Sequence, residues 1–276
     1  MYSLILIFCA EAALHLEGPE AVGYLYQPAF SMDYLLREPA EKYYPQPGDI
    51  FVCTDKGFLA KLGHWAARAW GPHHSGIVVA DNNGRLVLLE GGPHNTLHTR
   101  MSDLFFELAS YAEHDRVWIR RRKVALTQEQ SACLTAFAYS KDGAGFALIR
   151  MLGQLTPFRS RGPWRTVYRG GPHVDRSRFY CSELVTEACV AAGLVDAATA
   201  RPSASFPRDL FFGRSHNRFI DEHLDLSEWQ PPARWTSCPG QEIDSIRRFP
   251  RLDGDTPPKV PLSGNLIDTH LSSNPD

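Results

Sequence analysis

The stretch "HSGIVVADNNGRLVLLEGG", residues 74–92, carries the strongest secondary-structure signal in the sequence. Two apolar runs rich in β-branched residues flank Asn82, Asn83 and Gly84, and this pattern predicts a β-hairpin. Glycine at the third loop position favours a three-residue loop, in which a type I turn is followed by a residue with positive φ. The length of the loop then fixes which side chains share a face of the hairpin.

A three-residue loop places Glu90 opposite Gly76, and it makes His74 and Glu90 diagonal neighbours on one face. At a spacing of roughly 7–8 Å between Cα atoms, an imidazole and a carboxylate can reach each other. A loop of two or four residues would put them on opposite faces. Because Glu90 ends an apolar strand, we interpret it as a carboxylate that orients His74; the alternative is a strand-end glutamate that faces water.

A second stretch, "FYCSELVTEACVAAGL" (residues 179–194), has the apolar spacing of a helix that ends near Gly193. Cys181 falls in the first turn, where free N–H groups and the helix dipole favour a thiolate. Cys189 lies two turns further on the apolar side, and we interpret it as a packing residue. Cys181 is therefore the candidate nucleophile, with a buried unreactive thiol as the alternative.

A thiolate at a helix N-terminus needs a basic partner to attack a carbonyl, and histidine suits this role near neutral pH. The chain has eleven histidines. His74 stands out because it opens a predicted strand, where rigid backbone can aim it, and because Gly76 leaves room beside it. His73, His94 and His173 each follow a proline and are expected to face solvent.

The flanking sequence supplies further elements. Residues 48–55 ("GDIFVCTD") and 115–126 ("DRVWIRRRKVAL") are predicted strands, and residues 57–71 have helical spacing. Residues 127–143 are predicted to form a helix that begins with a capping box at Thr127 and stops at a glycine. The predicted order before the helix of Cys181 is strand, helix, hairpin, strand, helix.

These signals divide the chain into three parts. Residues 1–46, with several prolines, are predicted to be a leader of helical turns and loops packed on the core. Residues 47–230 form the predicted catalytic domain, in which the arginine- and glycine-rich segment 144–178 is a long insertion rather than a regular element. Residues 231–276, rich in proline, serine and charge, are predicted to be an extended or disordered tail.

Composition excludes some classes of function. Lysine and arginine total 29 against 31 acidic residues, so a nucleic-acid surface is not expected. Six cysteines without a C-x-x-C pair indicate a mostly reduced protein rather than a disulfide scaffold. The N-terminal apolar run lacks a basic start and soon meets an acidic residue, so we expect a cytoplasmic protein, for which membrane contact is an open alternative but not a requirement.

Taken together, five short blocks resemble the circularly permuted, NlpC-type papain-like cysteine hydrolases of the YiiX-like branch. The blocks follow the order of that family and span about 160 residues, although only these short motifs match. They are "GDIFV" (48–52), "HSGIVV" (74–79), "LLEGG" (88–92), "YCSELV" (180–185) and "FPRDL" (206–210).

The resemblance implies that Cys181 is the nucleophile, His74 the general base and Glu90 the residue that orients the imidazole. It implies an α+β fold, in which a small antiparallel sheet or barrel packs against helices. We expect no cofactor, and no metal either, because the sequence lacks an H-E-x-x-H motif and paired cysteines at ligand spacing. Two features depart from the family: "GAGF" (143–146) matches its Gly-x-x-Tyr-Asp motif only loosely, and the arginine-rich segment has no counterpart.

The predicted activity is hydrolysis or acyl transfer at an amide or ester bond of a peptide, a small molecule or a lipid-linked acyl group. We predict substrate contacts at Tyr180 and, for an anionic group, at Arg161 and Arg165. Two alternatives stay open. One is a zinc hydrolase with His73, His74 and Cys181 as ligands, and the other is a non-catalytic module that binds a lipid or peptide on the same fold.

Overall fold

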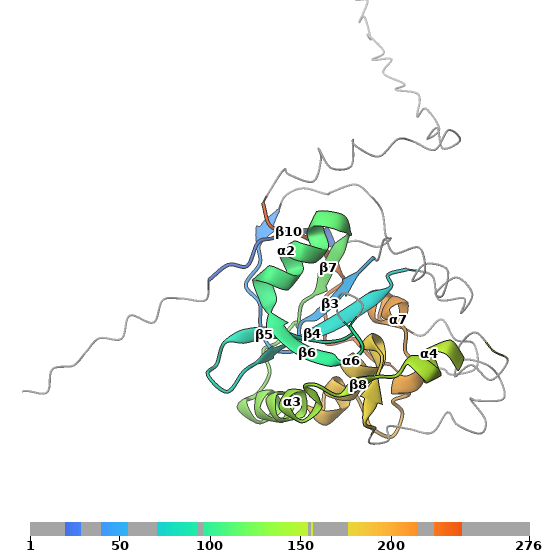
Figure 1. Ribbon diagram of the computed structural model, residues 1–276. Coiled ribbons are helices and arrows are strands. Elements are labelled where there is room, and N and C mark those ends of the chain that lie inside the picture. Colours follow the sequence, from blue (N-terminus) through green and yellow to red (C-terminus); the bar gives the residue numbers. More distant parts are fainter. Residues whose placement is uncertain are drawn as a thin grey trace, which may run out of the picture.

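The computed structural model describes residues 20–28, 40–54, 71–92, 96–153, 156, 176–214 and 224–238. Its centre is an eight-stranded antiparallel sheet with the order β2-β1-β10-β7-β3-β4-β5-β6 (Figure 1). The strands are β1 (Tyr24–Pro28), β2 (Glu41–Lys42), β3 (Ile50–Cys53), β4 (His74–Ala80), β5 (Leu86–Gly91), β6 (Thr99–Asp103), β7 (Val117–Arg120) and β10 (Ala233–Thr236).

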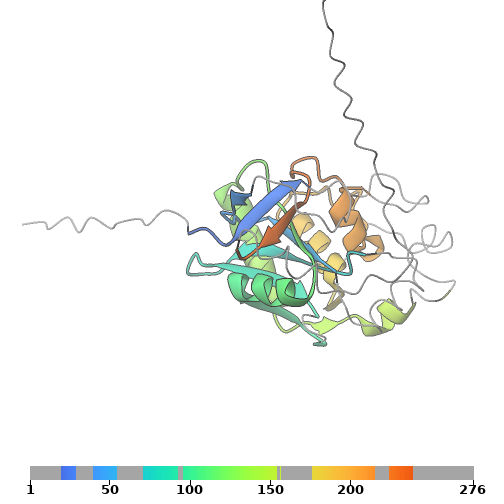
Figure 2. The same ribbon diagram turned by 90° about the horizontal axis from the view of Figure 1, so that it is seen from above.

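Helices cover both faces of the sheet (Figures 1 and 2). Helix α2 (Leu104–His114) lies on one face, where it packs on Phe51 and Val78. Helices α3 (Gln128–Lys141), α6 (Cys181–Ala191) and α7 (Pro207–Phe212) lie on the other, where they pack on Ile50, Val52 and Ile77. Neighbouring residues of β3 and β4 therefore point into different cores, as the two-residue period of a strand requires. None of the helices in the described ranges is long and apolar enough to cross a membrane.

The hairpin register predicted from the sequence is confirmed. Gly84 has a φ of 78°, and its N–H donates to the Asp81 carbonyl at 3.0 Å, which closes the three-residue loop. Gly76 pairs with Glu90. A Cβ atom at position 76 would lie only 2.9 Å from the Leu89 carbonyl oxygen, so the sheet leaves no room for a side chain there.

The two long predicted helices are also confirmed. Helix α3 begins after Thr127, whose side chain and that of Gln130 form the predicted capping box. Helix α6 begins at Cys181, and the chain turns at Gly193 with a φ of 65°. The predicted strand 48–55 corresponds to β3, and the predicted strand 115–126 corresponds to β7, which is shorter than predicted. Most of the predicted helix 57–71 lies outside the described residues.

The sheet is larger than the small sheet predicted, because both ends of the chain contribute strands to it. Strands β1 and β2 fall within the predicted leader 1–46, and β10 lies beyond the predicted domain boundary at residue 230. Strand β10 pairs with β1 on one side and β7 on the other. Leu25 of β1 and Trp235 of β10 are buried, so hydrophobic burial holds both ends on the domain.

The segment 144–178 was predicted to have no regular element, and this was wrong at both of its ends. Strand β8 (Gly145–Phe146) pairs in parallel with β9 (Arg178–Phe179), and helix α4 (Leu148–Gly153) follows β8. Two-residue strands have no readable period, so sequence patterns do not reveal them.

Candidate active site

Cys181 lies where the start of α6 meets the end of the hairpin. The preceding residue, Tyr180, is extended and caps the helix without a side-chain hydrogen bond. Gly91 of β5 lies against this turn, since a Cβ atom there would be 3.5 Å from both the N and Cα atoms of Cys181. The glycine therefore lets the helix N-terminus approach the strand ends where β4 begins at His74.

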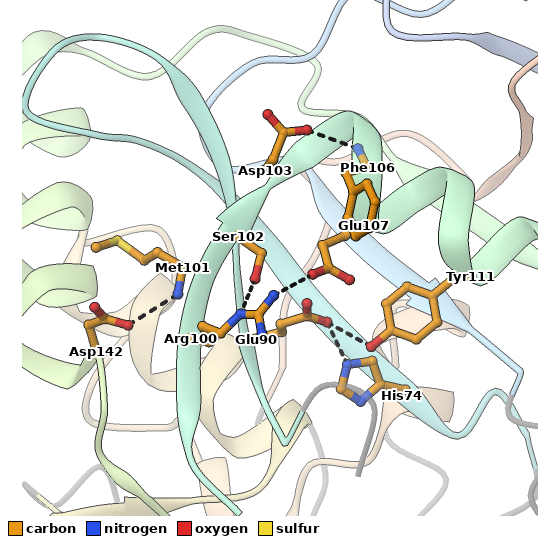
Figure 3. Close-up of polar contacts among 10 residues, drawn as sticks. All are labelled: His74, Glu90, Arg100, Met101, Ser102, Asp103, Phe106, Glu107, Tyr111 and Asp142. Carbon is orange, nitrogen blue, oxygen red and sulfur yellow. Dashed lines mark hydrogen bonds and ion pairs between the residues drawn. The ribbon is translucent and has the colours of Figure 1, made fainter. Parts of the chain in front are cut away.

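His74 and Glu90 form the predicted pair. The distance from His74 Nε2 to Glu90 Oε2 is 2.8 Å, and the Glu90 side chain is fully buried (Figure 3). The Nε2–H group donates a hydrogen bond to this buried carboxylate, which leaves Nδ1 of the neutral ring free to act as a base. The spatial relation predicted from the loop length is thus confirmed.

Cys181 and His74 contact each other as a coupled acid–base pair. Burial disfavours the charged form of His74, but hydrogen bonds to Cys181 and Glu90 outweigh it and raise the pKa of His74 to about 10. Burial likewise opposes ionisation of Cys181, but the hydrogen bond and the charge of His74 lower the pKa of the thiol. The Ser182 backbone N–H acts in the same direction. The pair is therefore arranged to hold a thiolate beside an imidazolium.

Tyr111 of α2 completes this arrangement, and sequence reasoning missed it. Its hydroxyl donates to Glu90 Oε2 at 3.1 Å, the same oxygen that binds His74, and its ring lies 5.5 Å from the His74 ring (Figure 3). Burial and the nearby Glu90 charge raise the pKa of Tyr111, so it stays a donor. The N-cap signal of Asp103 could have revealed α2. No local pattern, however, aims Tyr111 at Glu90.

A second buried carboxylate lies on the same face but has its own cation. Arg100, which pairs with Glu90 across β5 and β6, directs its guanidinium to Glu107 at 2.9 Å and to Ser102 at 2.8 Å (Figure 3). Glu107 is fully buried. Arg100 thus neutralises Glu107, whereas Glu90 is hydrogen-bonded to His74 and Tyr111.

Glu183, in the first turn of α6, binds two arginines from the segment before the cysteine. Arg150 and Arg176 each lie 2.7 Å from one of its carboxylate oxygens. Burial raises the pKa of Glu183 to about 7, and both arginines oppose this shift. These two ion pairs of Glu183 connect α4 and the residues before β9 to α6, the helix that carries the thiol. Sequence reasoning missed this contact too.

The other predicted residues have different outcomes. Tyr180 is buried, and its hydroxyl donates to the Ser203 carbonyl. Arg161 and Arg165 lie outside the described residues. The backbone carbonyl oxygen of His73 lies 3.9 Å from the Cys181 sulfur. Within the described ranges, no group of three or more histidine, cysteine or acidic side chains could hold a metal ion.

Replacing Tyr111 with phenylalanine is expected to slow alkylation of Cys181 by iodoacetamide about fivefold, the effect of losing one ordinary hydrogen bond. The Tyr111 hydroxyl also holds the Glu90 carboxylate in line with His74. Without it the carboxylate can turn away from the ring, so the imidazolium should lose its proton, and the rate should begin to change, at a lower pH on the alkaline side. Mass spectrometry of samples quenched at successive times, at a series of pH values, measures both effects. Tyr139→Phe is the control, because the exposed Tyr139 hydroxyl contacts only the hairpin loop in the described structure. Unchanged rate and profile in Tyr111→Phe would contradict this role.

Comparison with known proteins gives a weak likeness among solved structures. No family model matches the chain, and no curated protein matches it. Among solved structures, it is similar to the crystal structure of metalloprotein yiiX from Escherichia coli O157:H7, with 16% sequence identity and a TM-score of 0.39. The match covers 70% of this chain and 99% of that one.

Proposed function

We propose that the protein is a cysteine hydrolase or acyltransferase that cleaves an amide or ester bond through a thioester at Cys181. One observation carries the proposal: a buried chain of contacts runs from the Cys181 thiol through His74 to Glu90. A nucleophile, a base and a group that orients the base are the three parts that nucleophilic catalysis requires.

In the proposed reaction, the Cys181 thiolate attacks the substrate carbonyl carbon. The carbonyl oxygen gains negative charge, and the backbone N–H of Cys181, in the first turn of α6, can stabilise it. The His74 imidazolium then gives its proton to the leaving amine or alcohol, and the C–N or C–O bond breaks to leave a thioester. Water, or an alcohol or amine acceptor, loses a proton to His74 as it attacks the thioester and regenerates the thiolate.

Glu90 acts through His74 in this scheme. Glu90 accepts a hydrogen bond from Nε2–H throughout the cycle, so that Nδ1 is the nitrogen which exchanges protons with sulfur and substrate. The fold supports the proposal because the strands that carry His74 and Glu90 precede the helix of Cys181. This is the order that a permuted papain-like enzyme requires, and we propose that arrangement here. Peptides and lipid-linked acyl groups are the proposed substrate classes.

Labelling by a limiting amount of iodoacetamide, followed by peptide mapping, tests the proposal. Cys133 and Cys238 are exposed, so both should first be replaced by serine. We expect the label on Cys181 at pH 6, and no comparable label in Cys181→Ala. Hydrolysis of activated thioesters, esters and amides should disappear with the label and survive a strong chelator. Loss of activity to the chelator with an unlabelled Cys181 would favour metal chemistry and refute the proposal.

A further inference from the structure

Helix α4 exposes apolar side chains that no part of the core explains. None of its residues is buried. Ile149 is 81% exposed and Leu152 52%, while Leu148 and Met151 are 39% and 40% exposed. Leu97, 62% exposed, lies nearby, because its carbonyl accepts from the Phe146 N–H of β8. Water-facing apolar residues that gather in one place indicate an interaction surface.

Arginines surround this helix. Arg150 lies within α4, and Arg176 and Arg178 line the same hollow of about 340 Å³. Glu183 is paired with the first two at 2.7 Å each, whereas Arg178 has no carboxylate partner among the described residues. Glu183 and its buried neighbour Glu187 offset charge near the first two arginines, and the exposed Arg178 presents a positive charge at this surface. We call it the α4 surface: Leu97, Leu148, Ile149, Arg150, Met151, Leu152, Arg176 and Arg178.

We propose that the α4 surface docks on an anionic lipid bilayer. Apolar side chains beside arginines are the combination with which interfacial helices bind membranes: the apolar groups enter the headgroup boundary and the cations contact phosphates. The partly exposed stems of arginines can also lie along the acyl region while their charges stay in water. A bilayer therefore satisfies both halves of the surface.

Size and charge argue against a second copy of the chain as the occupant. A specific protein interface usually buries about 800 Å² on each partner, far more than a six-residue helix supplies. Two identical positive surfaces would also repel each other. An anionic bilayer does not repel these arginines, and its binding does not require a large complementary interface.

The docked surface would lie close to the thiol. Phe146 of β8 pairs with Phe179 of β9, which is two residues before Cys181. Arg178 packs its side chain over Gly145 in the same pair of strands. Docking would therefore hold the end of the sheet that carries the candidate site toward the membrane. The proposal does not depend on the proposed chemistry, since binding can be measured without turnover.

Vesicle co-sedimentation with the full chain tests the proposal. We expect binding to phosphatidylcholine vesicles that contain about 30% phosphatidylserine, weaker binding as salt rises, and little binding to pure phosphatidylcholine. Ile149→Asp with Leu152→Asp, and separately Arg178→Glu, should each weaken binding about tenfold or more. Circular dichroism should show that these variants stay folded, because the replaced side chains lie on the surface.

Two matched variants serve as controls. Phe106→Asp replaces a side chain that is 65% exposed on α2, and Arg85→Glu reverses an exposed charge on the hairpin. Both should bind like the original chain. Failure of the original chain to bind, equal binding to neutral vesicles, equal losses in the controls, or self-association abolished by Ile149→Asp would each overturn the proposal. The Cys181→Ala protein should bind normally, so a failure of the thiol chemistry would be seen separately.

Discussion

Replacing Cys181 with alanine is expected to lower kcat on an activated ester or amide by about 10⁴-fold or more, because no other group can form the acyl intermediate. The thiol lies in the first turn of α6, with His74 as its hydrogen-bond partner. Loss of the sulfur removes the attacking atom but leaves Glu90 and His74 in contact. The variant should therefore keep its fold while it loses turnover, and steady-state kinetics with a thermal melt measure both.

Cys189→Ala is the matched control, because Cys189 lies on the same helix. It is fully buried in the apolar core, and burial raises the pKa of its thiol to about 12. The alanine variant should lose a little stability, about 1 kcal/mol for the small cavity. It should keep kcat within about threefold, because the thiol takes no part in the chemistry. If Cys189→Ala abolished turnover and Cys181→Ala did not, the assignment of the nucleophile would be wrong.

The parts of the site that sequence could predict depend on local rules. The hairpin register follows from a three-residue loop with glycine at its third position, and that register alone brings His74 and Glu90 to one face. The start of α6 follows from helical spacing after two aromatic residues, so Cys181 could be placed in its first turn. In each case the deciding interactions lie within about twenty residues of sequence.

The parts that sequence could not predict depend on contacts between distant segments. Strand β1 pairs with β10, which joins Tyr24 to Thr236 across almost the whole described chain. Both strands are short and interrupted by charged or proline residues, so neither has a clear two-residue period. Tyr111 and Glu183 depend in the same way on where α2 and α4 pack. A carboxylate in a first turn gives no sign of which arginine it will meet.

A nearly flat pH profile is expected for alkylation of Cys181. The rate follows the thiolate fraction, and an ordinary thiol loses roughly a hundredfold between pH 8 and pH 6. The pKa of Cys181 is lowered, so its thiolate persists to lower pH, and the pKa of His74 is raised to about 10, so the imidazolium persists to higher pH. Between these limits the ion pair is the stable form. The rate with iodoacetamide should therefore fall by less than about tenfold from pH 8 to pH 6.

His74→Gln should restore the steep profile, since it removes the cation but keeps a side chain that can hydrogen bond to Glu90. Burial opposes ionisation of Cys181, and in this variant the charge of His74 no longer offsets it. The pKa of the thiol should therefore rise. At pH 6 the variant should react roughly a hundredfold more slowly than the original protein, and the difference should shrink as pH rises toward 10. Mass spectrometry of the peptide that contains Cys181, from pH 5 to pH 10, measures this directly. Parallel profiles for the two proteins would mean that His74 does not hold the thiolate, and the proposed catalytic pair would fail with it.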